Sequence, residues 1–98
     1  MTLNEIQITA EPICRRHCVR RLELFGSFAR GEAKVNSDID FCVSFEDLPP
    51  AEYSRQFFGL LHDLEDAFHI TVDLLTEASV RKVSLRKNLK TDGILVYG

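Results

Sequence analysis

The chain has 98 residues, 45% of them hydrophobic, and a net charge of −3 at pH 7. This length predicts a single domain, residues 1–98, built around one hydrophobic core. The slightly acidic balance gives no reason to expect direct binding to nucleic acid. No apolar run reaches the roughly 18 residues that a membrane-spanning helix needs. The N-terminal segment lacks the basic start and apolar core of a signal peptide, so we expect a cytoplasmic protein.

Helical and strand-like hydrophobic patterns alternate along the chain. Apolar residues step by three and four from Leu3 to His17, behind a Thr2–Glu5 capping box, which predicts an amphipathic helix. Pro12 lies inside this pattern and predicts a kink or a later helix start. Because strands alternate with helices, we expect an α/β (α+β) fold, a small mixed sheet with helices packed on it. The expected elements are a helix over 3–17, a strand over 20–25, a short helix over 27–32, a strand over 38–45, a helix over 51–68, a strand over 69–75, a helix over 79–89, and a short strand or extended tail over 93–97.

A Gly-Ser pair, Gly26-Ser27, stands where the first predicted strand turns into the short helix. A residue without Cβ makes such a turn at low cost and lets a phosphate approach the backbone. The Ser27 hydroxyl and the N–H groups beside it can bind anionic oxygens. A plain helix cap at Ser27 is the alternative, and the pair taken alone favours it.

Two aspartates, Asp38 and Asp40, lie one residue apart on the next predicted strand and therefore share one of its faces. Like charges so close together are unfavourable unless a cation lies between them. Mg²⁺ prefers oxygen ligands, and carboxylates together with substrate phosphates suit it. The alternatives are a solvated strand face with two acids, or a local cap by Ser37 with Asp38 in a turn.

A third aspartate, Asp73, lies in the otherwise apolar segment 70–75, where a charge needs a partner or a cation. Three carboxylates on neighbouring strands can hold two ions about 3.5–4 Å apart. One ion would carry a nucleoside triphosphate. The other would activate an attacking hydroxyl, with Asp73 also able to act as its base.

The segment Gly26-Ser27-Phe28-Ala29-Arg30-Gly31, followed by Ser37-Asp38-Ile39-Asp40, resembles the signature of the DNA polymerase β-like nucleotidyltransferase superfamily. The short length and Val72-Asp73-Leu74-Leu75 resemble its minimal nucleotidyltransferases, the MNT family. The likeness covers nearly the whole chain, and several spaced motifs agree.

This resemblance implies roles for individual residues. Gly26 and Ser27 would hold the nucleotide's phosphates, and Asp38 and Asp40 would bind both Mg²⁺ ions. Asp73 would complete the second ion site and help to deprotonate the acceptor. Arg30 also matches the family pattern as a candidate nucleotide-binding residue, and its pairing with an acid such as Glu32 or Asp38 is an equal alternative.

The resemblance also implies a partner. Members often act as antitoxins beside a HEPN-domain ribonuclease toxin, and some transfer AMP from ATP to a tyrosine of that toxin. We therefore expect a Mg²⁺-dependent protein adenylyltransferase that forms a hetero-oligomer with its toxin. Neutralisation by binding alone is the alternative, and the intact acid triad favours catalysis. Transfer to a small molecule such as an aminoglycoside is a weaker alternative, because the chain has no extra domain to enclose that acceptor.

The remaining polar residues carry weaker signals. Cys14, His17 and Cys18 crowd together, but no fourth zinc ligand follows with the usual spacing, so buried or half-buried thiols are favoured. Disulfides are not expected from an odd number of cysteines, with Cys42 the third, in a chain without an export signal. His62 and His69 are assigned no chemistry. A solvated helix face, or else a contact to partner or nucleotide, is expected for the basic residues Arg81, Lys82, Arg86, Lys87 and Lys90.

Overall fold

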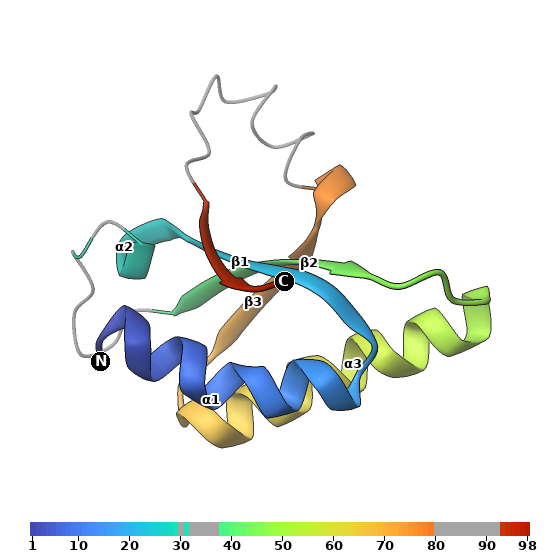
Figure 1. Cartoon of the computed structure of the whole chain (residues 1–98), viewed down its shortest axis with the longest axis horizontal. Helices are drawn as coiled ribbons and strands as arrows, with labels where there is room; N and C mark the ends of the chain where they lie inside the picture. The colour runs from blue at the N-terminus through green and yellow to red at the C-terminus, as the bar shows by residue number, and fades with distance from the viewer. Residues whose placement is uncertain (30, 32–37, 80–92) are drawn as a thin grey trace.

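A four-stranded mixed sheet with the strand order β3-β2-β1-β4 forms the centre of the computed structural model (Figure 1). The structure describes residues 1–29, 31, 38–79 and 93–98. Strand β1 pairs antiparallel with both β2 and β4, and β2 pairs parallel with β3. The predicted mixed α/β architecture is therefore confirmed. The elements are α1 (Leu3–Arg16), β1 (Val19–Phe25), α2 (Gly26–Ala29), β2 (Ile39–Phe45), α3 (Pro50–Phe68), β3 (Val72–Thr76) and β4 (Ile94–Tyr97).

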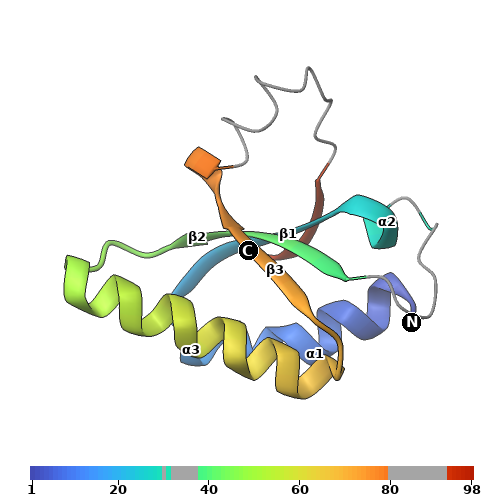
Figure 2. The ribbon, with the colours of Figure 1, turned by 180° about the vertical axis from the view of Figure 1, so that it is seen from behind.

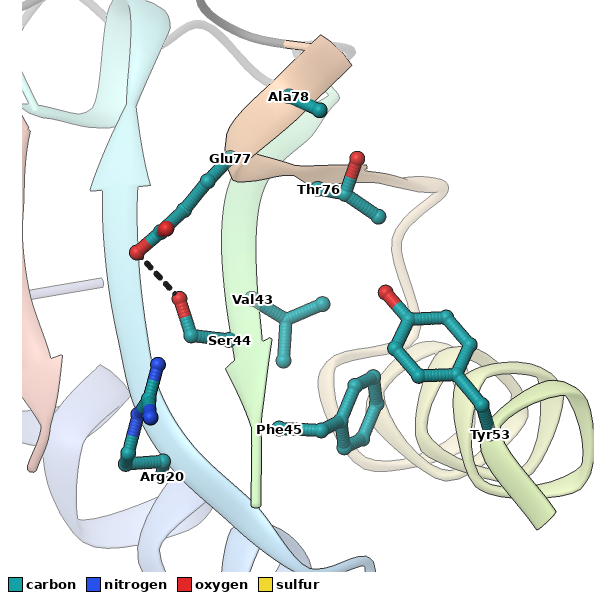
Figure 3. Close-up of a pocket in the computed structure, with 8 residues that line it drawn as sticks. All are labelled: Arg20, Val43, Ser44, Phe45, Tyr53, Thr76, Glu77 and Ala78. Carbon is teal, nitrogen blue, oxygen red and sulfur yellow. Dashed lines mark hydrogen bonds between the residues drawn. The ribbon is translucent and has the colours of Figure 1, made fainter. Parts of the chain in front are cut away.

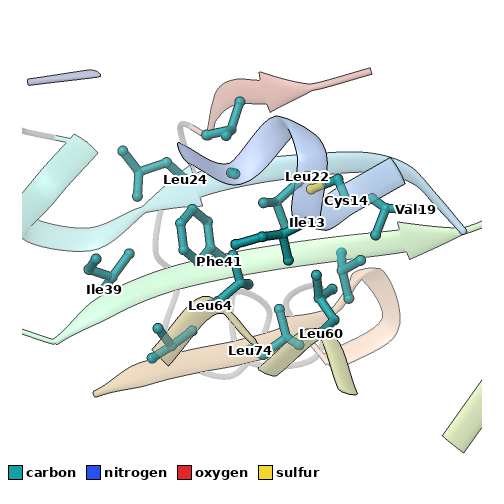
Figure 4. Packing of buried hydrophobic residues seen from close by; sticks show 14 of the residues in the cluster. Ile13, Cys14, Val19, Leu22, Leu24, Ile39, Phe41, Leu60, Leu64 and Leu74 are labelled. Atoms are coloured by element: carbon teal, nitrogen blue, oxygen red, sulfur yellow. The ribbon is translucent and has the colours of Figure 1, made fainter. Parts of the chain in front are cut away.

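The two long helices, α1 and α3, lie side by side against the same face of the sheet (Figures 1 and 2). Alternate residues of β2 explain this layering, because Ile39, Phe41 and Val43 are at most 1% exposed and pack into the core. Leucines of α3, Leu60 and Leu64, are fully buried against them (Figure 4). The opposite face, which we call the polar face, carries Glu23, Asp40 and Asp73.

Helix α1 starts as its sequence predicts, because the Thr2 hydroxyl accepts a hydrogen bond of 3.2 Å from the N–H of Glu5. Pro12 does not delay that start, since the helix is continuous from Leu3 to Arg16. Pro12 lies on the exposed side of the helix, where the carbonyl left without a backbone donor can bind water.

Two predicted boundaries were wrong by three residues. The third strand begins at Val72, three residues later than predicted, because His69 adopts a left-handed conformation (φ 55°) that ends α3. The Glu65 carboxylate then accepts a hydrogen bond of 3.1 Å from the N–H of Val72. Helix α2 ends at Ala29, short of the predicted residue 32, and Gly31 follows with φ 70°.

The C-terminal segment pairs as strand β4 along β1, so of the two predicted alternatives the strand is correct. The predicted helix over 79–89 lies outside the described residues, apart from Ser79. Among the residues that the structure describes, no helix is long and apolar enough to span a membrane.

The three thiols are free, with Cys14 and Cys42 buried and Cys18 half-buried, as predicted. Burial raises the pKa of Cys14 to about 12. It also raises the pKa of Cys42 to about 11, helped by the negative charges of Glu23 and Glu77. Both thiols are therefore protonated at neutral pH and are poor nucleophiles.

A side-chain cluster joins the end of α1 to the middle of α3. His17 Nε2 lies 2.6 Å from the carboxylate of Asp63, and Nδ1 lies 2.9 Å from the side-chain oxygen of Gln56. Gly59 leaves space for the ring, because a Cβ there would come within 2.8 Å of His17 Cε1. The hydrogen bond from His17 lowers the pKa of Asp63 below its ordinary value of 3.8.

This cluster predicts a pH-dependent contribution to stability. Because the pKa of Asp63 is lowered by folding, its contribution is present above about pH 4 and is lost as the pH falls through the folded-state value. Asp63→Asn should therefore lower the free energy of unfolding by about 0.2–1 kcal/mol at neutral pH, and by much less in acid. Urea unfolding from neutral to acidic pH measures this, with the exposed Asp66→Asn as control. A difference between Asp63→Asn and the native chain that is the same at every pH would contradict it.

Candidate active site

The turn from β1 into α2 is shaped by Gly26. Its φ of 72° lies in the left-handed region, which residues with a Cβ adopt only at a cost. A Cβ at this position would collide with the carboxylate oxygen Oδ2 of Asp40 and lie 3.1 Å from its Cγ. Gly26 is thus needed for the turn and also for the space that the Asp40 carboxylate occupies.

Asp40 and Asp73 are neighbours on the polar face. They are paired in register across the parallel strands β2 and β3, whose spacing is about 4.8 Å. On its other side, Asp40 pairs with Phe25, the residue before Gly26. The acid pair and the Gly26 turn therefore form one continuous site.

The exposure of Asp73 differs from the expectation based on its apolar segment. Val72 and Leu74 are buried on the helix side, whereas Asp73 is exposed on the polar face. A lone carboxylate in this strand is thus not desolvated, because strand side chains alternate between the two faces. The prediction that Asp73 needs a cation because it is buried was therefore wrong. The reason to expect a cation there is instead the position of Asp73 beside Asp40.

Asp38 lies immediately before β2 and is exposed. The next residue, Ile39, anchors the start of β2 through a hydrogen bond of 3.1 Å from its N–H to the carbonyl of Thr71. Within the described part of the chain, no three His, Cys, Asp or Glu side chains lie close enough together to hold a metal ion. The structure therefore brings Asp40 and Asp73 together but does not gather all three predicted acids.

Two of the predicted nucleotide-binding residues are only partly covered by the structure. Arg30 lies outside the described residues, and for Ser27 the description covers the backbone in α2 but not the side chain. Gly26 is the nucleotide-binding candidate whose surroundings are fully described.

The donor set fits a hard divalent cation. Two carboxylates side by side on an accessible sheet face supply the oxygen ligands that Mg²⁺ prefers, and leave positions for substrate oxygens. The Asp40 carboxylate can lie at the turn only because position 26 has no side chain, since a Cβ there would collide with it. Sequence reasoning identified these residues, but the steric dependence of Asp40 on Gly26 follows only from the β1–β2 register.

Comparison with known proteins gives consistent matches. The sequence profile of a family described as nucleotidyltransferase domain matches residues 6–96. Protein adenylyltransferase MntA of Thermococcus cleftensis is 38% identical over 85 residues, which cover 83% of each chain. A solved structure assigned to the minimal nucleotidyltransferases is 31% identical, with a TM-score of 0.63 over 94% of this chain and 95% of its own. A crystal structure of a toxin–antitoxin with AMP-PNP is 25% identical, with a TM-score of 0.69 over 94% of this chain and 73% of its own.

Proposed function

The chain belongs to the nucleotidyltransferase domain family, and we propose that it transfers AMP from ATP to a tyrosine hydroxyl of a HEPN-domain toxin, for which it is the antitoxin. Its relative from Thermococcus cleftensis is named as a protein adenylyltransferase, which supports AMP transfer as the reaction. The neighbour solved as a toxin–antitoxin with AMP-PNP supports the partner and the nucleotide. The observation that carries the proposal for this chain is the in-register pair of Asp40 and Asp73 beside Gly26.

Asp38, Asp40 and Asp73 would hold two Mg²⁺ ions in this proposal, with Gly26, Ser27 and Arg30 around the phosphates. Bound Mg²⁺ neutralises charge on the triphosphate and polarises the reacting phosphate. The protein's own contribution is to fix the carboxylates. Asp40 is fixed by the Gly26 turn, and Asp73 by its register with Asp40.

The reaction balances with one proton acceptor. The tyrosine oxygen forms a bond to the α-phosphorus of ATP. The bond from that phosphorus to the oxygen bridging to the β-phosphate breaks, and pyrophosphate leaves with the electron pair. Asp73 takes the hydroxyl proton, and its exposure lets the proton pass on to water. A cytoplasmic location suits the proposal, because free thiols persist there.

The position of a label in ATP tests the reaction type. Incubation of the chain with a HEPN-domain toxin, Mg²⁺ and ATP labelled at the α-phosphate should label the toxin. ATP labelled at the γ-phosphate should leave it unlabelled, because pyrophosphate carries that phosphate away. A chelator of Mg²⁺ should prevent labelling. Labelling from the γ-position, or none from the α-position, would contradict AMP transfer.

A further inference from the structure

A notch opens in the sheet beyond the last residue pair of β2 and β3, which is Val43 with Thr76. There β3 ends and the chain turns into a short helical segment, in which the N–H of Ser79 donates to the Thr76 hydroxyl (3.3 Å). Strand β2 continues to Phe45. A cavity of about 330 Å³ lies at this step (Figure 3). The notch is lined by Arg20, Ser44, Phe45, Tyr53, Thr76 and Glu77, among others.

The notch is separate from the proposed nucleotide site. Ser44 lies four residues along β2 from Asp40, which corresponds to about 13 Å at the rise of a strand. The volume of the notch is near the lower end of the range for ligand pockets, roughly 300–1,000 Å³. A short segment fits such a space, whereas a folded domain does not.

The floor of the notch is a strand edge. The N–H of Ile39 points to β3, where it donates to Thr71. Backbone direction repeats every second residue along a strand, so the backbone groups of Phe45 point to the same side. They lie beyond the last paired residue of β3. Among the residues that the structure describes, no strand pairs with this side of Phe45, and a strand edge of this kind can pair with an added strand.

The two walls of the notch differ in chemistry. On the polar side, the Ser44 hydroxyl donates to Glu77 Oε1 (2.5 Å), and Arg20 lies next to them (Figure 3). On the other side, the rings of Phe45 and Tyr53 meet edge to face with their centroids 5.1 Å apart. Alternate side chains of an added strand would point to these two walls in turn.

From the strand edge at Phe45 and the two unlike walls, we infer that the notch binds a short extended segment of the partner protein as an added strand on β2. The segment alternates apolar residues, which contact Phe45 and Tyr53, with polar or charged residues, which face Arg20 and Glu77. The identification of the partner as the HEPN-domain toxin rests on the proposed function. Main-chain hydrogen bonds would supply affinity, and the two walls would supply specificity.

Filling the notch tests this inference. Ala78 lines the cavity and is exposed, so Ala78→Trp should occupy it without disturbing the core. Toxin binding measured by calorimetry should weaken at least tenfold. The matched control Ala67→Trp, at an exposed position of α3, should bind like the native chain. Thermal unfolding of both variants checks that they are folded. Native affinity in a folded Ala78→Trp would overturn the inference.

Amide hydrogen exchange gives a second, direct readout. The Phe45 amide should exchange more slowly in the complex than in the chain alone, and an unchanged rate would overturn strand addition. If AMP transfer occurs while Ala78→Trp binds normally, the notch fails and the proposed function stands. If the toxin binds through the notch but receives no AMP, the proposed function fails and the binding site stands. A native chain that does not bind the toxin would overturn both.

Discussion

Asp73→Asn is expected to reduce AMP transfer to the toxin by about 10³-fold or more and to leave toxin binding unchanged. The amide cannot accept the tyrosine proton and is a poor Mg²⁺ ligand, and metal stabilisation of charge is worth several kcal/mol. Each 1.36 kcal/mol is a factor of ten in rate. The side chain of Asp73 is exposed on the polar face, beside Asp40 on the neighbouring strand, so the substitution removes no packing from the core.

Transfer rate and toxin affinity measured on the same variant separate the two roles of an antitoxin. Asp47→Asn, at an exposed position after the far end of β2, is the matched control and should transfer normally. If Asp73→Asn still neutralises the toxin fully at equal concentration, binding alone is sufficient. Transfer within tenfold of the native rate would remove Asp73 from the proposed site.

Gly26→Ala is expected to damage both the fold and the reaction. The alanine requires a left-handed backbone, which costs about 1–2 kcal/mol. It also collides with the Asp40 carboxylate, and such overpacking costs about 1–3 kcal/mol more. AMP transfer should be lost even in the fraction that folds, because the collision displaces Asp40.

Gly31→Ala is the control for the cost of placing alanine in a left-handed backbone conformation. Gly31 has a similar φ of 70°, but a Cβ there would meet no atom within 4 Å. Urea unfolding should therefore show a larger loss in the free energy of unfolding for Gly26→Ala than for Gly31→Ala. Adding Asp40→Ala to Gly26→Ala should recover the excess, because it removes the colliding group. Equal losses for the two glycines would mean that Asp40 moves away at no cost.

Most of the architecture follows from residue patterns in the chain. The alternation in β2 predicts both its buried face and the polar face that carries Asp40. The end of α3 at Phe68 agrees with the prediction, but the start of β3 at Val72 was missed, because the left-handed conformation of His69 is uncommon for a residue with a Cβ and nothing in the local sequence distinguishes it.

The candidate site was only partly predictable, because local spacing can be read from the sequence and strand register cannot. The spacing of Asp38 and Asp40 and the Gly26-Ser27 turn can be read directly from the sequence. The pairing of Asp40 with Asp73, and of Asp40 with the Gly26 turn, depends on strand register, which involves residues far apart in the chain. The notch combines residues from β1, β2, α3 and β3 and the turn after it, so no local motif announces it.

Intact-mass spectrometry of the toxin tests the central claim most directly. After incubation with the native chain, ATP and Mg²⁺, the toxin should gain the mass of at least one AMP, located on tyrosine by fragmentation. The toxin incubated with Asp40→Asn should keep its original mass. A toxin that the native chain neutralises while its mass stays unchanged would contradict catalysis by the Asp40–Asp73 pair.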